Sequence, residues 1–213
     1  MSGLPGLVLD GVIDVSHHNG RIDWARAAAA GIALAFVKAS EGARFVDPAF
    51  AENRAAAVAA GLRVVPYHFI DPGDPVAQAR HFVAVAALAP GCAAMLDWET
   101  RCPAASLVTI GGYVREATGR DPVGYYGAGQ LVAADPTLSR WPLMLPEYPR
   151  GERPGDYSTL VTAPPRLPPG RDPGRPYDFH QYTPAGRVPG IAGPVDRSVW
   201  VGTADQLHKW HGG

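Results

Sequence analysis

Residues 93–99, AAMLDWE, are the fourth of eight strand-like runs in this chain, and two carboxylates close the run. If the run is a β-strand, Asp97 and Glu99 point to one face of the sheet and Trp98 points to the other. Neighbouring acids repel each other and are costly to desolvate, so a purely structural strand seldom carries such a pair. A protonated and an ionised carboxyl side by side suit acid–base chemistry. A solvated strand end is the alternative interpretation.

Runs of the same kind alternate with Ala-rich stretches on both sides of residues 93–99. The intervening stretches favour helices, and three of them close on glycines suited to helix C-caps: Gly31, Gly61 and Gly119. Successive run starts are 22, 29, 31 and 29 residues apart, which is typical of β/α units around a parallel sheet. The first five predicted strands begin near Gly11, Ala33, Leu62, Ala93 and Pro122.

The last third of the chain has strands without good helices between them: Pro142–Glu147, Tyr177–Thr183 and Pro194–Trp200. Residues 149–176 contain eight Pro and four Gly, too many for a helix, and are interpreted as a long ordered loop. The pattern predicts an α/β fold, an irregular TIM-like barrel of five β/α units followed by three strands with few helices. One domain over residues 1–213 is expected, with 149–176 as a loop insertion. An open doubly wound sheet is the alternative, but no G-x-G-x-x-G follows the first strand.

Composition excludes several classes of function. A net charge of −1 gives no reason to expect nucleic-acid or membrane-surface binding, and no apolar run is long enough to span a membrane. The first residues lack the features of a signal peptide. Cys92 and Cys102 would lie about 20 Å apart along an extended strand, so two free thiols are expected. No residues at ligand spacing suggest a metal site, and no cofactor is expected.

Active sites of β/α barrels lie at the C-terminal ends of the strands, and acids and aromatics recur there in this chain. Four acids and several tyrosines at one barrel mouth suit a sugar, since aromatic faces pack on pyranose C–H surfaces and carboxylates bind hydroxyls or transfer protons. The residues at the predicted strand ends are Asp14, Lys38, Glu41, Tyr67, His68, Phe69, Asp97, Glu99, Tyr125, Tyr126, Glu147 and Tyr148, with Asp196 inside the eighth strand.

Six segments together resemble the glycoside hydrolase family 25 lysozymes, the Chalaropsis-type N-acetylmuramidases of bacteria, fungi and phages. They occur in the family's order across nearly the whole chain, which separate chance matches would not produce. The segments are GVIDVSHHNGRIDW (11–24), FVKASEG (36–42), VVPYHF (64–69), LDWE (96–99), HQYTPAGRVPGIAG (180–193) and VDRSVWVG (195–202).

The resemblance implies cleavage of the β-1,4 bond between N-acetylmuramic acid and N-acetylglucosamine in bacterial peptidoglycan. It assigns Glu99 as the general acid, and Asp97 as a nucleophile or as the group that orients the substrate's N-acetyl group. Asp14 and Asp196 would stabilise positive charge on the sugar ring. The spacing of Asp97 and Glu99 leaves both retention and inversion open. The residues expected to bind substrate are Tyr67, Tyr126, Tyr148, Phe69 and Gln181.

Two departures from the family pattern lie in the last strands, and both are expected to face the substrate groove. His180 stands where the family usually has Trp, and MLPEY (144–148) replaces an apolar-Trp-x-Ala-x-Tyr pattern, which makes Met144 and Glu147 unusual. They favour the rival interpretation, a non-catalytic glycan-binding barrel. A chitinase-like barrel needs further acids before Asp97, and residues 92–96 contain none. The loop at 149–176 either covers the groove or is a passive insertion.

Several residues have structural interpretations. His68 and Trp98 are expected to face outward into packing, and Lys38 is expected to pair with Glu41. Only one of Tyr125 and Tyr126 can face inward by alternation, and Tyr126 is chosen on the resemblance. The protein is expected to be a monomer that acts on the cell wall, outside the cytoplasm. Without a visible signal peptide, it would be released like a phage endolysin or lack its leader.

Overall fold

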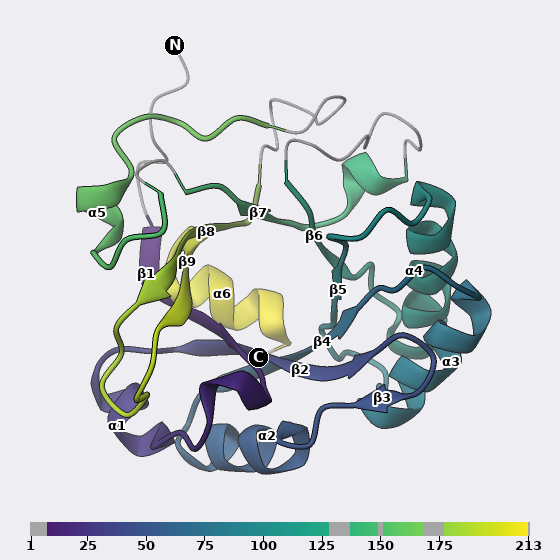
Figure 1. Ribbon diagram of the computed structural model, residues 1–213, viewed down its shortest axis with the longest axis horizontal. Coiled ribbons are helices and arrows are strands. Elements are labelled where there is room, and N and C mark those ends of the chain that lie inside the picture. Colours follow the sequence, from purple (N-terminus) through teal and green to yellow (C-terminus); the bar gives the residue numbers. More distant parts are fainter. Residues whose placement is uncertain (1–7, 128–136, 149–150, 168–176, 213) are drawn as a thin grey trace.

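The described residues form a closed eight-stranded barrel with one extra edge strand (Figure 1). The computed structural model describes residues 8–127, 137–148, 151–167 and 177–212. The strand order is β1-β9-β8-β7-β6-β5-β4-β2-β3, and parallel pairing of β1 with β2 closes the barrel. The strands are β1 (Val8–Val15), β2 (Leu34–Glu41), β3 (Phe45–Val46), β4 (Arg63–Phe69), β5 (Met95–Asp97), β6 (Val123–Tyr125), β7 (Leu143–Pro146), β8 (Phe179–Gly186) and β9 (Val195–Val201).

Helices follow the first strands as the sequence predicts. Gly31 and Gly119 have φ of 96° and 75°, the left-handed conformation expected just past a helix end. A helix after β6 would fall on residues 128–136, outside the described part. No helix in the described ranges is long and apolar enough to cross a membrane. The helices are α1 (Trp24–Ala29), α2 (Phe50–Ala59), α3 (Pro75–Val85), α4 (Ala104–Thr118), α5 (Tyr157–Leu160) and α6 (Ala204–His211), with 3-10 turns at His17–Asn19 and Leu138–Arg140.

The direction of β9 decides which residues meet at the mouth. Neighbouring barrel strands from β1 through β8 pair in parallel, whereas β9 runs antiparallel to both β8 and β1. The beginning of β9 therefore lies beside the ends of β1 and β8. The eight predicted strands and the irregular barrel are confirmed; the assignment of the whole chain to one domain stays a prediction.

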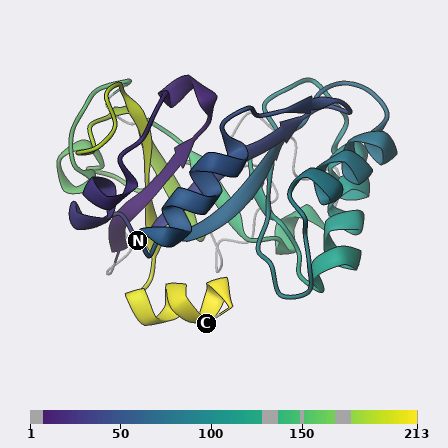
Figure 2. The ribbon, with the colours of Figure 1, turned by 90° about the horizontal axis from the view of Figure 1, so that it is seen from below.

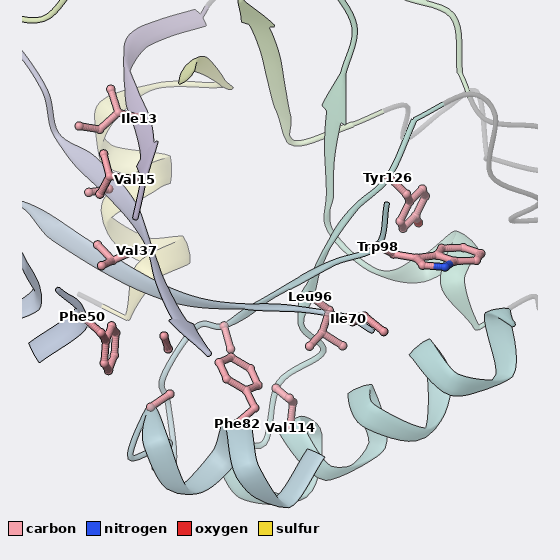
Figure 3. Packing of buried hydrophobic residues seen from close by; sticks show 14 of the residues in the cluster. Ile13, Val15, Val37, Phe50, Ile70, Phe82, Leu96, Trp98, Val114 and Tyr126 are labelled. Atoms are coloured by element: carbon pink, nitrogen blue, oxygen red, sulfur yellow. The ribbon is translucent and has the colours of Figure 1, made fainter. Parts of the chain in front are cut away.

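Two apolar layers result from the alternation of side chains along the strands. One cluster fills the barrel interior and includes Phe36, Met95 and Phe179. A larger cluster lies between the barrel and its helices (Figure 3). The helix α6, which was not predicted, lies across the end of the barrel opposite the mouth (Figure 2) and places Leu207 and Trp210 against the interior cluster.

The Pro-rich segment is described over residues 151–167 and packs on the outer face of β8 and β9. Tyr157 of this segment shares a small apolar cluster with Tyr182 of β8, and the Asp156 carboxylate lies 3.2 Å from an Arg197 guanidinium nitrogen. The prediction that the segment holds no helix is wrong, because one turn, α5, forms between the prolines. Cys92 and Cys102 are free thiols, as expected.

Candidate active site

Four carboxylates predicted from the sequence converge at the barrel mouth. Asp14 is the last residue but one of β1 and the direct cross-strand partner of Asp196 on β9, which places their Cβ atoms about 4.5–5.5 Å apart. Asp97 ends β5, and Glu99 follows two residues later. The charge of Glu99 raises the pKa of each of the other three acids, so all four lie within one electrostatic environment.

The Asp14–Asp196 pair holds a proton at neutral pH. Burial raises the pKa of Asp14 to about 6, partly opposed by hydrogen bonds from its neighbours. Burial and then the Asp14 charge raise the pKa of Asp196 to about 9. Two adjacent buried carboxyls cannot both ionise cheaply. The pair therefore shares one proton at neutral pH, and the larger rise of the Asp196 pKa favours Asp196 as the protonated partner and Asp14 as the carboxylate.

Asp97 and Glu99 differ in their surroundings. Asp97 is 7% exposed, and burial followed by the charges of Glu99 and Asp14 raises its pKa well above the ordinary value. Its Oδ1 has no hydrogen-bond partner among the described residues. Glu99 is exposed at the mouth and reaches solvent. A buried carboxyl oxygen without a partner is unfavourable, so a ligand that brings a donor to Asp97 gains affinity.

Gln181 connects the acids to the tyrosines of the mouth. Its side chain is almost fully buried, and its Nε2 donates to both carboxylate oxygens of Asp14, at 3.0 and 2.9 Å. Its Oε1 accepts the hydroxyls of Tyr125 and Tyr148. Because two O–H donors fix the oxygen end of the amide, the nitrogen end must face Asp14. Gln181, predicted to bind substrate, thus holds Asp14 in place.

The choice of Tyr126 as the inward-facing tyrosine is corrected. Tyr125 belongs to the interior cluster, whereas Tyr126 is fully buried in the outer layer, where its ring meets Trp98 edge-to-face at 6.0 Å (Figure 3). The Tyr126 hydroxyl donates to the Leu138 carbonyl oxygen. A Cβ at Gly124 would lie 2.4 Å from the Tyr126 ring, so glycine leaves room for that ring outside β6.

Tyr67 and Phe69 point to the mouth from β4, as predicted. Burial and the Asp97 charge raise the pKa of Tyr67 well above its ordinary value, so its phenol stays a neutral donor. Phe69 is the Cα partner of Asp97. The predicted ion pair between Lys38 and Glu41 is confirmed at 2.6 Å, and the Lys38 ammonium lies 4.8 Å from the centre of the Phe69 ring.

His180 and Met144 do not reach the groove, so that expectation is wrong for both. His180 lies on the outer face of β8, edge-on to the rings of Tyr157 and Tyr177, and burial lowers its pKa to about 4. Met144 is fully buried in the barrel interior. His68 faces outward as predicted and stacks on Phe82 at 5.1 Å.

The cluster combines an ionised Asp14, carboxyls with raised pKa values and a solvent-reaching Glu99. Such a set can donate a proton to a leaving oxygen while a carboxylate stabilises positive charge nearby. Within the described ranges, no three His, Cys, Asp or Glu side chains are arranged to hold a metal ion. A cavity of about 900 Å³ lies elsewhere, between α1, α2 and residues 188–192, and includes none of the predicted site residues.

The sequence is similar to one protein family and to individual proteins along most of its length. The family model described as glycosyl hydrolases family 25 matches residues 13–191. The chain is 33% identical to the uncharacterised protein YegX of Escherichia coli K12, over 93% of this chain and 72% of that protein. It is 29% identical to lysozyme M1 of Streptomyces globisporus, over 92% and 69% respectively.

A solved structure agrees with these sequence matches. The bacterial lysozyme from Streptomyces coelicolor superposes with a TM-score of 0.80 at 26% identity, over 97% of each chain. The family match covers most of the barrel, including three of the four clustered acids, Asp14, Asp97 and Glu99. By its sequence, its fold and the acids at its mouth, the chain belongs to glycosyl hydrolases family 25 and is a glycosidase.

Proposed function

We propose that the protein is a lysozyme that cleaves the β-1,4 bond between N-acetylmuramic acid and N-acetylglucosamine in bacterial peptidoglycan. The convergence of Asp14, Asp97, Glu99 and Asp196 at one barrel mouth is the observation that supports the proposal most directly. Its relative lysozyme M1 supports the substrate class. The protein acts at the cell wall, as a monomer, and uses no cofactor.

Glu99 is the general acid of this proposal. Among the four acids it is the exposed one, so it can reach a glycosidic oxygen that enters from solvent. The Asp14 carboxylate, buried in the same acidic cluster, stabilises positive charge that develops on the sugar ring. Asp196 carries the proton that keeps the pair from double ionisation.

Asp97 is proposed to orient the substrate's acetamido group rather than to attack the sugar. Its raised pKa and burial make it a poor nucleophile in the free enzyme, because attack needs the ionised form. Its unpartnered Oδ1 can accept the acetamido N–H. That contact would turn the acetamido oxygen toward the anomeric carbon, which is the arrangement of substrate assistance and predicts retention.

The substitution Glu99→Gln tests the proposal. It removes the proton donor and keeps the size of an exposed side chain, so reducing-end release from purified peptidoglycan should fall by at least about a hundredfold, the scale of general-acid catalysis. The melting temperature should stay within about 2 °C, since exposed substitutions change stability little. Glu116→Gln, exposed on α4, is the matched control and should keep full activity. Full activity in Glu99→Gln would remove Glu99 from the role of acid.

The rival function, glycan binding without turnover, loses its main support in the structure. Met144 and His180, the departures that favour it, are fully buried and therefore do not line an open groove. Wild-type protein that binds peptidoglycan yet releases no reducing ends would nevertheless establish the rival.

A further inference from the structure

The turn beyond β2 carries an exposed aromatic ring at the rim of the mouth. In the described part of the chain, three large apolar side chains are exposed, and two of them, Phe45 (41%) and Val46 (47%), make up β3. This strand pairs with the end of β2, with Phe45 opposite Glu41 (Figure 1). The third, Val58, lies on α2. Single exposed apolar side chains are common on protein surfaces, so what distinguishes Phe45 is its place beside the active-site mouth.

Lys38 links the Phe45 ring to the carboxylates. Its ammonium lies 5.9 Å from the centre of the Phe45 ring and 4.8 Å from that of Phe69, the Cα partner of Asp97. The charge of Lys38 also acts on Asp97. The buried Lys38 and the half-buried Phe69 therefore connect Asp97 to Phe45, which places Phe45 next to the proposed active site.

The ring of His17 supports the same surface from the β1 side. Its centroid lies 5.8 Å from that of Phe45, and its Nδ1 lies 2.7 Å from Asp47 Oδ2. Asp47 is buried and also accepts the backbone N–H of His17, at 3.1 Å. Phe45 is thus flanked by a positioned ring on one side and by an ion-paired lysine on the other.

A groove of about 330 Å³ adjoins Phe45, within the size range of small-molecule sites. Its lining combines one cation, Arg44, with three acids, Glu41, Asp71 and Asp74. Such a mixed set offers donors and acceptors to hydroxyl and acetamido groups. The apolar face beside it is an aromatic ring, which packs on the C–H face of a pyranose.

We propose that Phe45 and this groove form an outer saccharide subsite that binds an N-acetylated sugar of the same glycan strand, away from the cleaved bond. The proposal rests on the proposed function for the identity of the strand. It commits to the glycan rather than to the stem peptide, because an exposed aromatic face next to the carboxylate cluster suits a sugar ring.

Peptide-free glycan strands of defined length test the subsite. For Phe45→Ala, kcat/KM should fall about three- to tenfold on octasaccharides and clearly less on tetrasaccharides, because only longer strands reach the rim. Phe45→Trp keeps an aromatic face, so its kcat/KM on octasaccharides should stay close to that of the wild type. Val58→Ala removes an even more exposed apolar side chain on α2 and should leave kcat/KM unchanged at every length.

Direct binding separates this proposal from the proposed function. In the Glu99→Gln background, calorimetric titration with octasaccharides should show about three- to tenfold weaker binding when Phe45→Ala is added. An equal loss on all lengths would overturn the subsite. A parallel titration with peptide-bearing strands is the second arm: a loss seen only with those strands would also overturn it and assign the surface to the stem peptide. Length-dependent binding through Phe45 in a wild-type protein that releases no reducing ends would overturn the proposed function and support the subsite.

Discussion

Gln181 is the residue on which the geometry of the acidic cluster depends most. Gln181→Met keeps the volume and removes the N–H donor to Asp14, a hydrogen bond to a charged group worth about 1.5–3 kcal/mol. We expect kcat/KM on peptidoglycan to fall about tenfold or more. The loss of a donor destabilises the Asp14 carboxylate and raises its pKa, so the acid limb of the pH–rate profile should move to higher pH.

Tyr148→Phe is the matched control for Gln181→Met. It removes one of the two hydroxyls that fix the amide oxygen and leaves the donor to Asp14 in place, so its effect on rate and on the acid limb should be smaller. An unmoved acid limb in Gln181→Met, with only a lower melting temperature, would reduce Gln181 to a packing residue.

The sequence predicted the acids of the site correctly, but it predicted the orientation and contacts of the surrounding residues less well. Asp97 and Glu99 stood out because two carboxylates at one strand end are unusual, and Asp14 because it interrupts an apolar run. The tyrosines were harder, since Tyr125 and Tyr126 are adjacent and only the phase of β6 decides which faces inward. That phase depends on Gly124, whose missing side chain makes room for Tyr126 outside the barrel. The pairing of Gln181 with Asp14 joins residues 167 positions apart, which no local pattern shows.

Helix α4 contains two adjacent glycines, and replacing each by alanine should change the stability of the protein in opposite directions. A Cβ at Gly111 would lie 2.2 Å from Cη2 of Trp141, a ring buried in the outer core. Gly111→Ala should therefore lower the free energy of unfolding by about 1–3 kcal/mol, as overpacking does, despite the better helix propensity of Ala. Urea unfolding at neutral pH measures the change.

The neighbouring Gly112 provides the control on the same helix. A Cβ there meets nothing within 4 Å, so Gly112→Ala should gain up to about 1 kcal/mol from helix propensity alone. Equal effects of the two substitutions would show that Trp141 moves aside without cost. The sequence alone cannot rank them, because Trp141 approaches α4 from a segment that follows β6.

Helices and strands were predictable from the sequence where their hydrophobic patterns are long. The elements that were missed, such as α6 and β3, are short. The eight barrel strands and α1 to α4 follow the apolar runs and the Ala-rich stretches. Helix α6 has only eight residues, fewer than the window of about 11–18 residues over which a helical period is read with confidence. Its capping box, Thr203 with Gln206, is the one local signal that marks its start. The strand β3 spans two residues and exists through its pairing with β2.

At the scale of the whole molecule, the barrel concentrates acids at one end and seals the other. The reversed direction of β9 brings Asp196 beside Asp14, and α6 closes the far end with Leu207 and Trp210. The mouth is thereby the polar end of an otherwise apolar interior. Burial of several carboxyls there costs stability, which is a common feature of functional sites.

The buried acids and histidines should act in opposite directions on stability as pH changes. Burial lowers the pKa of His68 and His180 to about 4, so below about pH 6.5 the unfolded chain binds protons that the folded protein does not. Because of these two histidines, the free energy of unfolding therefore decreases as the pH falls below about 6.5. The raised pKa of Asp196 works the other way: above about pH 4 the folded protein retains a proton that the unfolded chain has released.

Above about pH 7.5 His68 and His180 are neutral in both the folded and the unfolded chain, so they no longer affect the slope, whereas Asp196 still does. Between about pH 7.5 and about 9 the folded protein holds the Asp196 proton, so the free energy of unfolding should fall by up to about 1.4 kcal/mol per pH unit from this group. Asp196→Asn removes the titrating group, and urea unfolding across this range should show a shallower decline. Asp205→Asn, exposed on α6, is the control and should keep the wild-type slope. An identical slope in wild type and Asp196→Asn would mean that Asp196 is already ionised at neutral pH, and Asp14 would then need another partner for its charge.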